Sequence, residues 1–436
     1  MQMEEAKKGK ITEEMKVIAK DEMLELRKIC SLVAKGHVII TRNIVRKNVH
    51  PIGIGSKLFT KINTNVGTSA DLCDVNLEIE KAKIAVKFGS DTVMDLSTAG
   101  DLDEVRRKII DSINVPIGTV PIYQAGLEAI KKHGSIVDMT ADEIFKVIEK
   151  HLKDGVDFIT VHCGLTKSIV DRLVKHPRKM GIVSRGGCFL AAWMKHNQEE
   201  NPLYKDFDTL LNIAKEYDVC LSLGDSLRPG CLEDASDWYQ NQELFNIGKL
   251  VGIARKVNVQ IIVEGPGHMP LNHIVNNVKL EKRVCKGAPY YILGPLVTDI
   301  GCPYDHISGA IGGALAGLAG ADFLCVVTPS EHLGIPLVED VKEGVIASKL
   351  AAHSVDIAKL GKKAVKKDEE ISSARAMLKW DEQFKNCIDP EKAEKIYKRI
   401  QTKSNGCTMC GENCALLLMR EFLRDNKQKN DKNKLA

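Results

Sequence analysis

Three cysteines near the end of the chain have a spacing that points to chemistry. Cys407, Cys410 and Cys414 fall within eight positions, in the stretch "GCTMCGENC". A structural zinc site needs four ligands, and no cysteine or histidine follows Cys414. A [4Fe–4S] cluster can be held by three thiolates, which leaves one iron open to a small molecule. The neighbouring glycines Gly406 and Gly411 would let the backbone wrap closely around such a compact group.

Two other interpretations of these cysteines stay open on spacing alone. One is a zinc site completed by Cys387 or by a distant histidine, and the other is a CxxC redox pair with Cys414 incidental. The remaining cysteines are scattered. Four of them stand among aliphatic residues and are interpreted as small core residues: Cys163, Cys220, Cys285 and Cys325.

The elements that must position a site follow a repeating pattern in the larger part of the chain. Short β-branched runs end in a polar or glycine-rich turn, and a segment of helical periodicity follows each. One such segment, "TADEIFKVIEKHLKDG", begins with Thr140 as a helix N-terminus signal. The nine runs are "KINTNVG", "DTVMDLS", "VPIGTVPIY", "VDFITVHCG", "MGIVSRGG", "VCLSLGDSLRPG", "VQIIVEGPGH", "PYYILGP" and "DFLCVVTPSEH".

This alternation predicts an α/β fold, a (β/α)8 TIM-like barrel with one accessory element. An open doubly wound sheet is the alternative, but no P-loop is present and no glycine-rich dinucleotide motif opens a helix after the first run. In a barrel the carboxyl ends of all strands face one shared mouth, where catalysis takes place. Polar residues such as Asn65, His162, Asp225 and Glu264 stand at the ends of the runs, so we expect a site there.

Composition narrows the class of protein. The chain has 436 residues, 44% hydrophobic and 28% charged, with a formal net charge of +4. No basic stripe is interleaved with aromatic residues, so we expect no nucleic-acid partner. The charged N-terminus lacks a secretory signal, and the most apolar run, from Gly309, is broken by Asp322. We therefore expect a cytoplasmic protein without a membrane span.

The domain organisation follows from where the alternation begins and ends. Beyond the barrel the pattern becomes purely helical, and the charged end of the chain is typical of disorder. The predicted segments are an N-terminal segment 1–56, a barrel catalytic domain 57–335, a helical C-terminal domain 336–405, an iron–sulfur motif 406–420 and a disordered tail 421–436.

Several motifs, in order, resemble the phosphomethylpyrimidine synthase family of thiamine biosynthesis in its short form. They are "GIVSRGG", "LSLGDSLRPGC", "IVEGPGHMP", "YDHISGAIGGA", "VTPSEHLGIP" and "CTMCGENC", and the likeness runs from about Met3 to Met419. The resemblance implies a radical S-adenosylmethionine lyase with a [4Fe–4S] cluster on the three cysteines. Such an enzyme rearranges 5-aminoimidazole ribotide into 4-amino-5-hydroxymethyl-2-methylpyrimidine phosphate, releasing formate and CO. It also implies a low-potential electron donor and a homodimer.

The resemblance assigns site residues one by one. It implies a zinc site at His268 and His332. Arg185 and Arg228 could hold the phosphate, and Asp225 could accept from the substrate's amine and hydroxyl groups. The substrate-binding residues that it implies are Asn65, Met94, Tyr123, His162, Ser184, Arg185, Gly186, Asp225, Ser226, Leu227, Arg228, Glu264 and Tyr291.

The chain departs from the family pattern in four places. "KLFTK" has Phe59 where many members have arginine, "GDS" has Ser226 where most have glycine, and "GCPYDH" replaces "APGYDH". The cluster motif CX2CX3C is one residue shorter than that of the long-form enzymes. We expect each change to touch the barrel mouth or the cluster loop. Two alternative functions therefore stay open: 5-hydroxybenzimidazole synthase of anaerobic cobamide biosynthesis, and a catalytically silent paralogue that binds the ribotide or a cluster.

Overall fold

The computed structural model divides the chain into two compact units. The first unit is Met1–Leu360 and the second begins at Gly361. The structure describes residues 1–402 and 405–423. Most of the predicted tail 421–436 lies outside the described residues, so its state stays a prediction.

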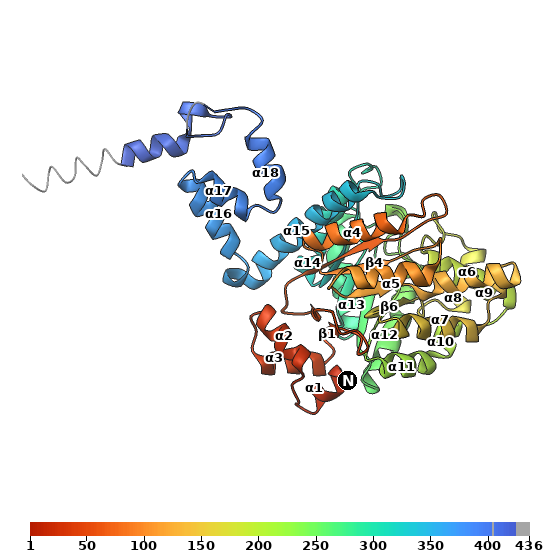
Figure 1. Cartoon of the computed structure of the whole chain (residues 1–436). Helices are drawn as coiled ribbons and strands as arrows, with labels where there is room; N and C mark the ends of the chain where they lie inside the picture. Colours follow the sequence, from red (N-terminus) through yellow and green to blue (C-terminus); the bar gives the residue numbers. More distant parts are fainter. Residues whose placement is uncertain (403–404, 424–436) are drawn as a thin grey trace, which may run out of the picture. The chain divides into compact units, whose positions relative to one another are not determined.

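Eight parallel strands close into a barrel in the first unit (Figure 1). Strands that follow one another in the chain are hydrogen-bonded neighbours in the barrel. The last strand pairs with the first, with Cys325 opposite Asn63, and this pairing closes the barrel. This closure confirms the (β/α)8 prediction and excludes the open sheet. The strands are β3 (Lys61–Val66), β4 (Thr92–Asp95), β5 (Ile117–Thr119), β6 (Phe158–Val161), β7 (Cys220–Leu223), β8 (Ile261–Gly265), β9 (Tyr290–Ile292) and β10 (Phe323–Cys325).

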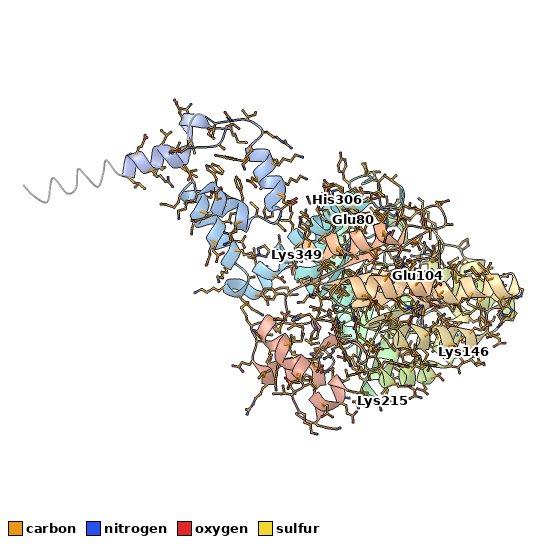
Figure 2. All side chains as sticks on the ribbon, viewed as in Figure 1. Glu80, Glu104, Lys146, Lys215, His306 and Lys349 are labelled. Atoms are coloured by element: carbon orange, nitrogen blue, oxygen red, sulfur yellow. The ribbon has the colours of Figure 1, made fainter. Side chains whose placement is uncertain are left out.

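Helices cover the outside of the barrel, with charged side chains such as Glu104, Lys146 and Lys215 on them (Figure 2). Thr140 caps one helix as predicted, because its hydroxyl accepts from the Glu143 amide while the Glu143 carboxylate accepts from the Thr140 amide. The helices are α4 (Val75–Lys87), α5 (Leu102–Ser112), α6 (Pro121–His133), α7 (Ala141–Lys153), α8 (Lys167–Lys175), α9 (Arg185–Asn197), α10 (Pro202–Lys205), α11 (Phe207–Glu216), α12 (Trp238–Lys256), α13 (Leu271–Val284), α14 (Asp305–Ala319) and α15 (Val338–Leu360).

One of the nine predicted strands, "MGIVSRGG", is not a strand. Its last residues begin α9, and Ser184 caps that helix by accepting from the Gly187 amide at 3.2 Å. The glycine Gly187 explains why this segment begins a helix and is not a strand. A Cβ on Gly187 would lie 2.6 Å from the Ser226 Cβ, so this helix start packs directly against the turn after β7. The segment is therefore the accessory element of the barrel.

The N-terminal segment covers the amino end of the barrel, where the strands begin. Helices α1 (Gln2–Lys7), α2 (Glu13–Asp21) and α3 (Leu26–Ala34) share a small core of their own. The hairpin of β1 (Val38–Thr41) and β2 (Ile52–Gly55) follows, a pair of strands that the sequence did not reveal. Ile39 and Ile54 join the barrel core, and the Gln260 side chain, just before β8, bonds both the amide and the carbonyl of Ile40.

The described part of the second unit is helical, which confirms the predicted helical C-terminal region. It contains α16 (Lys366–Ala376), α17 (Trp380–Asn386) and α18 (Pro390–Tyr397), and Trp380 stacks on Tyr397 with ring centroids 4.4 Å apart. Helix α15, which the sequence placed in the C-terminal domain, belongs to the first unit and packs along α14. Among the described residues, none of the helices has the length and apolar character needed to span a bilayer.

Candidate active site

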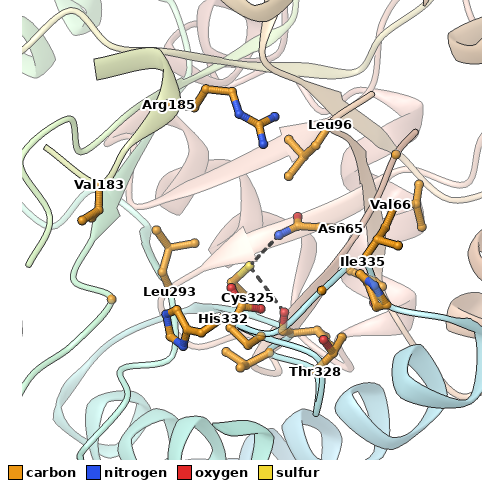
Figure 3. A pocket seen from close by; sticks show the side chains of 18 of the residues that line it. Asn65, Val66, Leu96, Val183, Arg185, Leu293, Cys325, Thr328, His332 and Ile335 are labelled. Carbon is orange, nitrogen blue, oxygen red and sulfur yellow. Dashed lines mark hydrogen bonds between the residues drawn. The ribbon is translucent and has the colours of Figure 1, made fainter. Parts of the chain in front are cut away.

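A cavity of about 660 Å³ opens at the carboxyl ends of the barrel strands (Figure 3). In this view Arg185 reaches in across the cavity from His332, with Asn65 and Cys325 between them. Six of the predicted site residues line the cavity: Asn65, Tyr123, Arg185, Arg228, His268 and His332. The other predicted substrate residues are buried: Met94, His162, Ser184, Gly186, Asp225, Ser226, Leu227, Glu264 and Tyr291.

A network of amide and hydroxyl groups supports the cavity wall at Asn65. The side-chain amide of Asn63 donates to the Tyr291 hydroxyl at 2.8 Å and to the Asn65 carbonyl oxygen at 3.0 Å. Asn65 in turn donates to the Cys325 sulfur at 3.3 Å. Cys325 is buried, as expected of a core cysteine, but it also lines the cavity. Burial raises the pKa of its thiol to about 12, which keeps the sulfur protonated.

Glu264 places a carboxylate inside the barrel near its mouth. One oxygen of this carboxylate accepts from the Thr160 hydroxyl at 2.7 Å and from the Ser222 hydroxyl at 2.9 Å. Its strand neighbour in register is Tyr291 on β9. Burial raises the pKa of Glu264, because desolvation disfavours the charged form. The two hydroxyls and the Asp225 backbone amide fix the position of this carboxylate.

His162 meets the start of α9. Its Nε2 lies 2.9 Å from the Ser184 hydroxyl oxygen, and its Nδ1 is buried without a hydrogen-bond partner. Gly186 allows this approach, since a Cβ there would lie 2.4 Å from the imidazole Cε1. Burial lowers the pKa of His162 to about 3, so the ring is neutral at physiological pH. Gly186 of the "SRGG" motif is therefore needed for the close contact between α9 and His162.

Two guanidinium groups give the cavity a positive side. Arg228 lies 3.5 Å from the Asp225 carboxylate, and the Arg185 guanidinium stacks over the Tyr123 ring at 4.9 Å. Burial raises the pKa of Asp225 well above its usual range, while Arg228 acts in the opposite direction. Two guanidinium groups that line one cavity suit a phosphate or carboxylate ligand.

His268 and His332 both line the cavity, and their rings lie next to one another. His268 follows β8 and bonds Asp299 through Nδ1 at 2.8 Å, and His332 follows β10 and bonds Asp305 through Nδ1 at 3.1 Å. The two Nε2 atoms lie 3.4 Å apart. In the part of the chain that the structure describes, no three His, Cys, Asp or Glu side chains together form a metal-holding group. Two imidazoles, each oriented by a carboxylate, are nevertheless a donor set that fits an open zinc site.

The three clustered cysteines share one tight loop in the second unit. Cys414 is buried, Cys407 is half-buried, Cys410 is exposed, and none of them forms a disulfide. Gly411 has φ +54°, and its amide donates to the Cys407 carbonyl at 2.9 Å, which turns the loop between the first two cysteines. Three free thiols on such a loop fit the donor set of an iron–sulfur cluster.

One departure from the family pattern lies away from the mouth. Phe59 precedes β3, at the amino end of the barrel, where its amide donates to Glu22 at 2.7 Å. The expectation that this change touches the mouth or the cluster loop is therefore wrong. Ser226 does lie in the turn after β7, but it is not among the residues with left-handed backbone, so this position does not need glycine. In "GCPYDH" the Asp305 contact to His332 is present.

Sequence reasoning missed three carboxylates that support the site. Asp299 and Asp305 orient the two histidines, and Glu243 on α12 accepts from the backbone of the turn after β7. Asp305 stands inside the motif "YDHISGAIGGA", which offered a signal. Neither Asp299 nor Glu243 has a local signal, because each acts on a residue distant in the sequence.

A closed (β/α)8 barrel with a polar cavity at the carboxyl ends of its strands defines a TIM-barrel enzyme. The chain belongs to the Radical SAM ThiC family, which it matches over residues 1–421. It is therefore a radical S-adenosylmethionine enzyme, and membership implies an iron–sulfur cluster and S-adenosylmethionine as cofactors.

Its relatives are similar over nearly their whole length. The phosphomethylpyrimidine synthase of Methanocaldococcus jannaschii is 55% identical over 97% of this chain and 99% of its own. That of Pyrococcus furiosus is 56% identical over 97% and 98%. Among solved structures, a dihydropteroate synthase from Coxiella burnetii aligns with a TM-score of 0.44 at 13% identity, covering 73% of this chain and 99% of that chain.

Proposed function

We propose that this enzyme shares the phosphomethylpyrimidine synthase activity of its relatives. Its substrate would be 5-aminoimidazole ribotide, and its products 4-amino-5-hydroxymethyl-2-methylpyrimidine phosphate, formate and CO. The observation that carries this proposal is the cavity, which Arg185 and Arg228 line, together with the buried carboxylates of Asp225 and Glu264 near Arg228. The guanidinium groups suit the phosphate of a ribotide, and the carboxylates suit its amine and hydroxyl donors. The cavity volume of about 660 Å³ is in the range of small-molecule sites.

The predicted substrate-binding residues take distinct roles in this proposal. Ser184, Arg185 and Gly186 stand at the N-terminus of α9, where the helix dipole favours an anion such as the phosphate. The neutral ring of His162 offers its unpaired Nδ1 as a hydrogen-bonding group without adding charge. Tyr291 and Asn65 fix the position of the substrate through their hydrogen-bond network. Met94 supplies an apolar surface beneath it.

We further propose that His268 and His332 bind zinc. In a tetrahedral zinc site each ligand nitrogen lies about 2.05 Å from the metal, which places two such nitrogens about 3.3–3.4 Å apart. The observed separation of the Nε2 atoms is 3.4 Å. Asp299 and Asp305 hold the Nδ1 atoms, which leaves both Nε2 lone pairs for the metal. Water or substrate would complete the ligand shell.

Cys407, Cys410 and Cys414 would hold the [4Fe–4S] cluster in this proposal. When bound, the cluster and S-adenosylmethionine supply the one-electron chemistry that starts the rearrangement. The exposed Cys410 lies where an electron donor of low potential can approach. We assign the motif 406–420 to this function and the barrel to substrate binding. Such a pathway enzyme would work in the cytoplasm.

We also propose a homodimer, formed through the outer face of α14. Tyr304, Ile307, Ile311 and Leu318 are each about half exposed or more, and they repeat at intervals of three, four and seven residues. Residues 307–319 contain no charged side chain. An apolar stripe of this kind marks an interface. It is self-complementary about a twofold axis, because Ile307 would meet Leu318 of a second copy and Ile311 would meet the small Ala314.

Product analysis tests the proposed function. Purified protein is reconstituted anaerobically with iron and sulfide, and then given 5-aminoimidazole ribotide, S-adenosylmethionine and a low-potential reductant. Mass spectrometry should detect the hydroxymethylpyrimidine phosphate. Hydroxybenzimidazole as the product would instead assign the enzyme to cobamide synthesis. A fully loaded cluster that yields no 5′-deoxyadenosine would contradict the proposal in favour of a silent paralogue.

A further inference from the structure

The turn Asp225–Arg228 contributes the buried carboxylate of Asp225 and the cavity-lining guanidinium of Arg228 to the candidate site. Side chains outside the turn form hydrogen bonds with its backbone. The amides of Ser226 and Leu227 donate to the two carboxylate oxygens of Glu243, at 3.0 and 2.7 Å. The carbonyl of Leu227 accepts from the Arg178 guanidinium at 2.7 Å. Three backbone groups of a four-residue turn are thus bonded to two side chains outside it.

Both side chains are buried and fixed in place. Glu243 is 2% exposed on α12, and Arg178 is 9% exposed in the segment between α8 and α9. Arg178 also donates to the Asp234 carbonyl at 3.0 Å and lies 2.9 Å from the Asp237 carboxylate. A buried carboxylate is costly unless it is hydrogen-bonded. In keeping with that cost, burial raises the pKa of Glu243 to about 7, and its two amide donors act to lower it.

Neighbouring glycines leave the turn little room to move. A Cβ on Gly187 would lie 2.6 Å from the Ser226 Cβ and 2.8 Å from its Cα. A Cβ on Gly164 would lie 2.9 Å from the Glu243 Cγ. Helix α9 therefore packs against one side of the turn, and the loop after β6 packs against the glutamate that holds it. The backbone position of the turn is therefore set by α12, by α9 and by the segment between α8 and α9 that contains Arg178.

We propose that Glu243 and Arg178 are positioning residues, which hold the turn so that Asp225 and Arg228 stand in their binding geometry before the ribotide arrives. Neither side chain lines the cavity, so each acts through the turn. A preformed site avoids the entropic cost of ordering a loop on binding. The identity of the ligand rests on the proposed function, whereas the restraint of the turn does not.

The decisive variant is Glu243→Gln. Glutamine presents one oxygen and one amino group to two amide donors, so one amide loses its acceptor. Titration calorimetry of the cluster-loaded enzyme with 5-aminoimidazole ribotide should show a dissociation constant raised about tenfold or more. Hydrogen exchange, followed by mass spectrometry, should become faster in the peptide that contains Ser226 and Leu227. Arg178→Lys, which retains the charge but loses the forked donor, should act in the same direction.

Glu281→Gln is the matched control. Glu281 is also fully buried, lies on the neighbouring helix α13, and has a pKa raised by burial to about 7. Its charged neighbours are Lys282, Asp322 and Arg255, and Asp322 precedes β10 at the amino end of the barrel. This change should leave ribotide affinity and exchange in the turn unaltered.

Each outcome bears on the proposal. Wild-type affinity and exchange in Glu243→Gln would overturn it, and so would an equal loss of affinity in Glu281→Gln. If Glu243→Gln does not fold, Arg178→Lys serves as the test. Hydrogen exchange in the turn that is unchanged in Arg178→Lys would then overturn the proposal. If the wild-type enzyme does not bind the ribotide, the proposed function fails, while exchange in the turn still tests the restraint.

Discussion

The Nε2 atoms of His268 and His332 lie 3.4 Å apart, and each ring is held through Nδ1 by a carboxylate. We expect His332→Ala to lose bound zinc and to retain its iron, because the proposed cluster ligands lie on another part of the chain. Elemental analysis of the reconstituted protein measures both metals. His306→Ala, on the same turn of α14 as Asp305, is the control and should retain both. Unchanged zinc in His332→Ala would refute the metal role.

The carboxylates behind the histidines should matter as well. We expect Asp299→Asn and Asp305→Asn to lower zinc affinity about 10- to 100-fold, because each removes the group that fixes an imidazole. Competition with a chromogenic chelator measures the affinity. Glu331→Gln provides a comparison, since Glu331 lies beside His332 but makes no hydrogen bond to either ring nitrogen. A larger loss in Glu331→Gln than in both aspartate variants would contradict this assignment.

The cysteine loop can be tested against its alternatives. Cys410→Ala should lose the cluster absorbance and the formation of 5′-deoxyadenosine, since a cluster left with two thiolates is labile. Iron content and chromatography of the reaction mixture measure these losses. Cys387→Ala should behave as the wild type. If Cys387→Ala loses metal as Cys410→Ala does, the loop is a four-ligand site and the three-thiolate assignment fails.

Gly186 should not tolerate a side chain. In Gly186→Ala the new Cβ would meet the His162 ring at 2.4 Å, so the start of α9 or the ring must move. We expect a large loss of ribotide affinity, measured by calorimetry. Gly252→Ala is the control, because Gly252 is also helical and its nearest neighbour would be a lysine tip at 3.5 Å. That change should stabilise α12 by up to about 1 kcal/mol. Equal affinity in both variants would contradict the close packing.

Protonation of His162 should make stability depend on pH. Its pKa falls from 6.5 to about 3 on folding, so between these values the unfolded chain binds the additional proton. The free energy of unfolding should therefore decline as pH falls below about 6.5. Urea titrations from pH 7.5 to pH 4.5 measure this slope, which His162→Asn should reduce. An identical slope in both proteins would show that the histidine is not held neutral.

The face of α14 should set the oligomeric state. Ile311→Asp places a charge in the middle of the apolar stripe and should yield monomers, as measured by light scattering after size-exclusion chromatography. Val174→Asp, at a similarly exposed apolar position on α8, should leave the assembly unchanged. A dimer that persists in Ile311→Asp would exclude this face as the interface.

The sequence by itself determined the class of fold and most of the candidate site. Alternating apolar runs and amphipathic segments are local patterns, and they predicted eight barrel strands together with the residues at their ends. The three cysteines were also readable, because all of them lie within eight positions. The ordered motifs indicated the family for the same reason.

Only the tertiary structure decided which distant residues meet. It made "MGIVSRGG" a helix start, because Gly186 and Gly187 pack against His162 and Ser226, contacts that no local periodicity encodes. It placed Phe59 at the amino end of the barrel. It also joined His268 to His332, and the turn after β7 to Glu243. These pairs form only once the barrel has closed, since closure brings together residues that lie far apart along the chain.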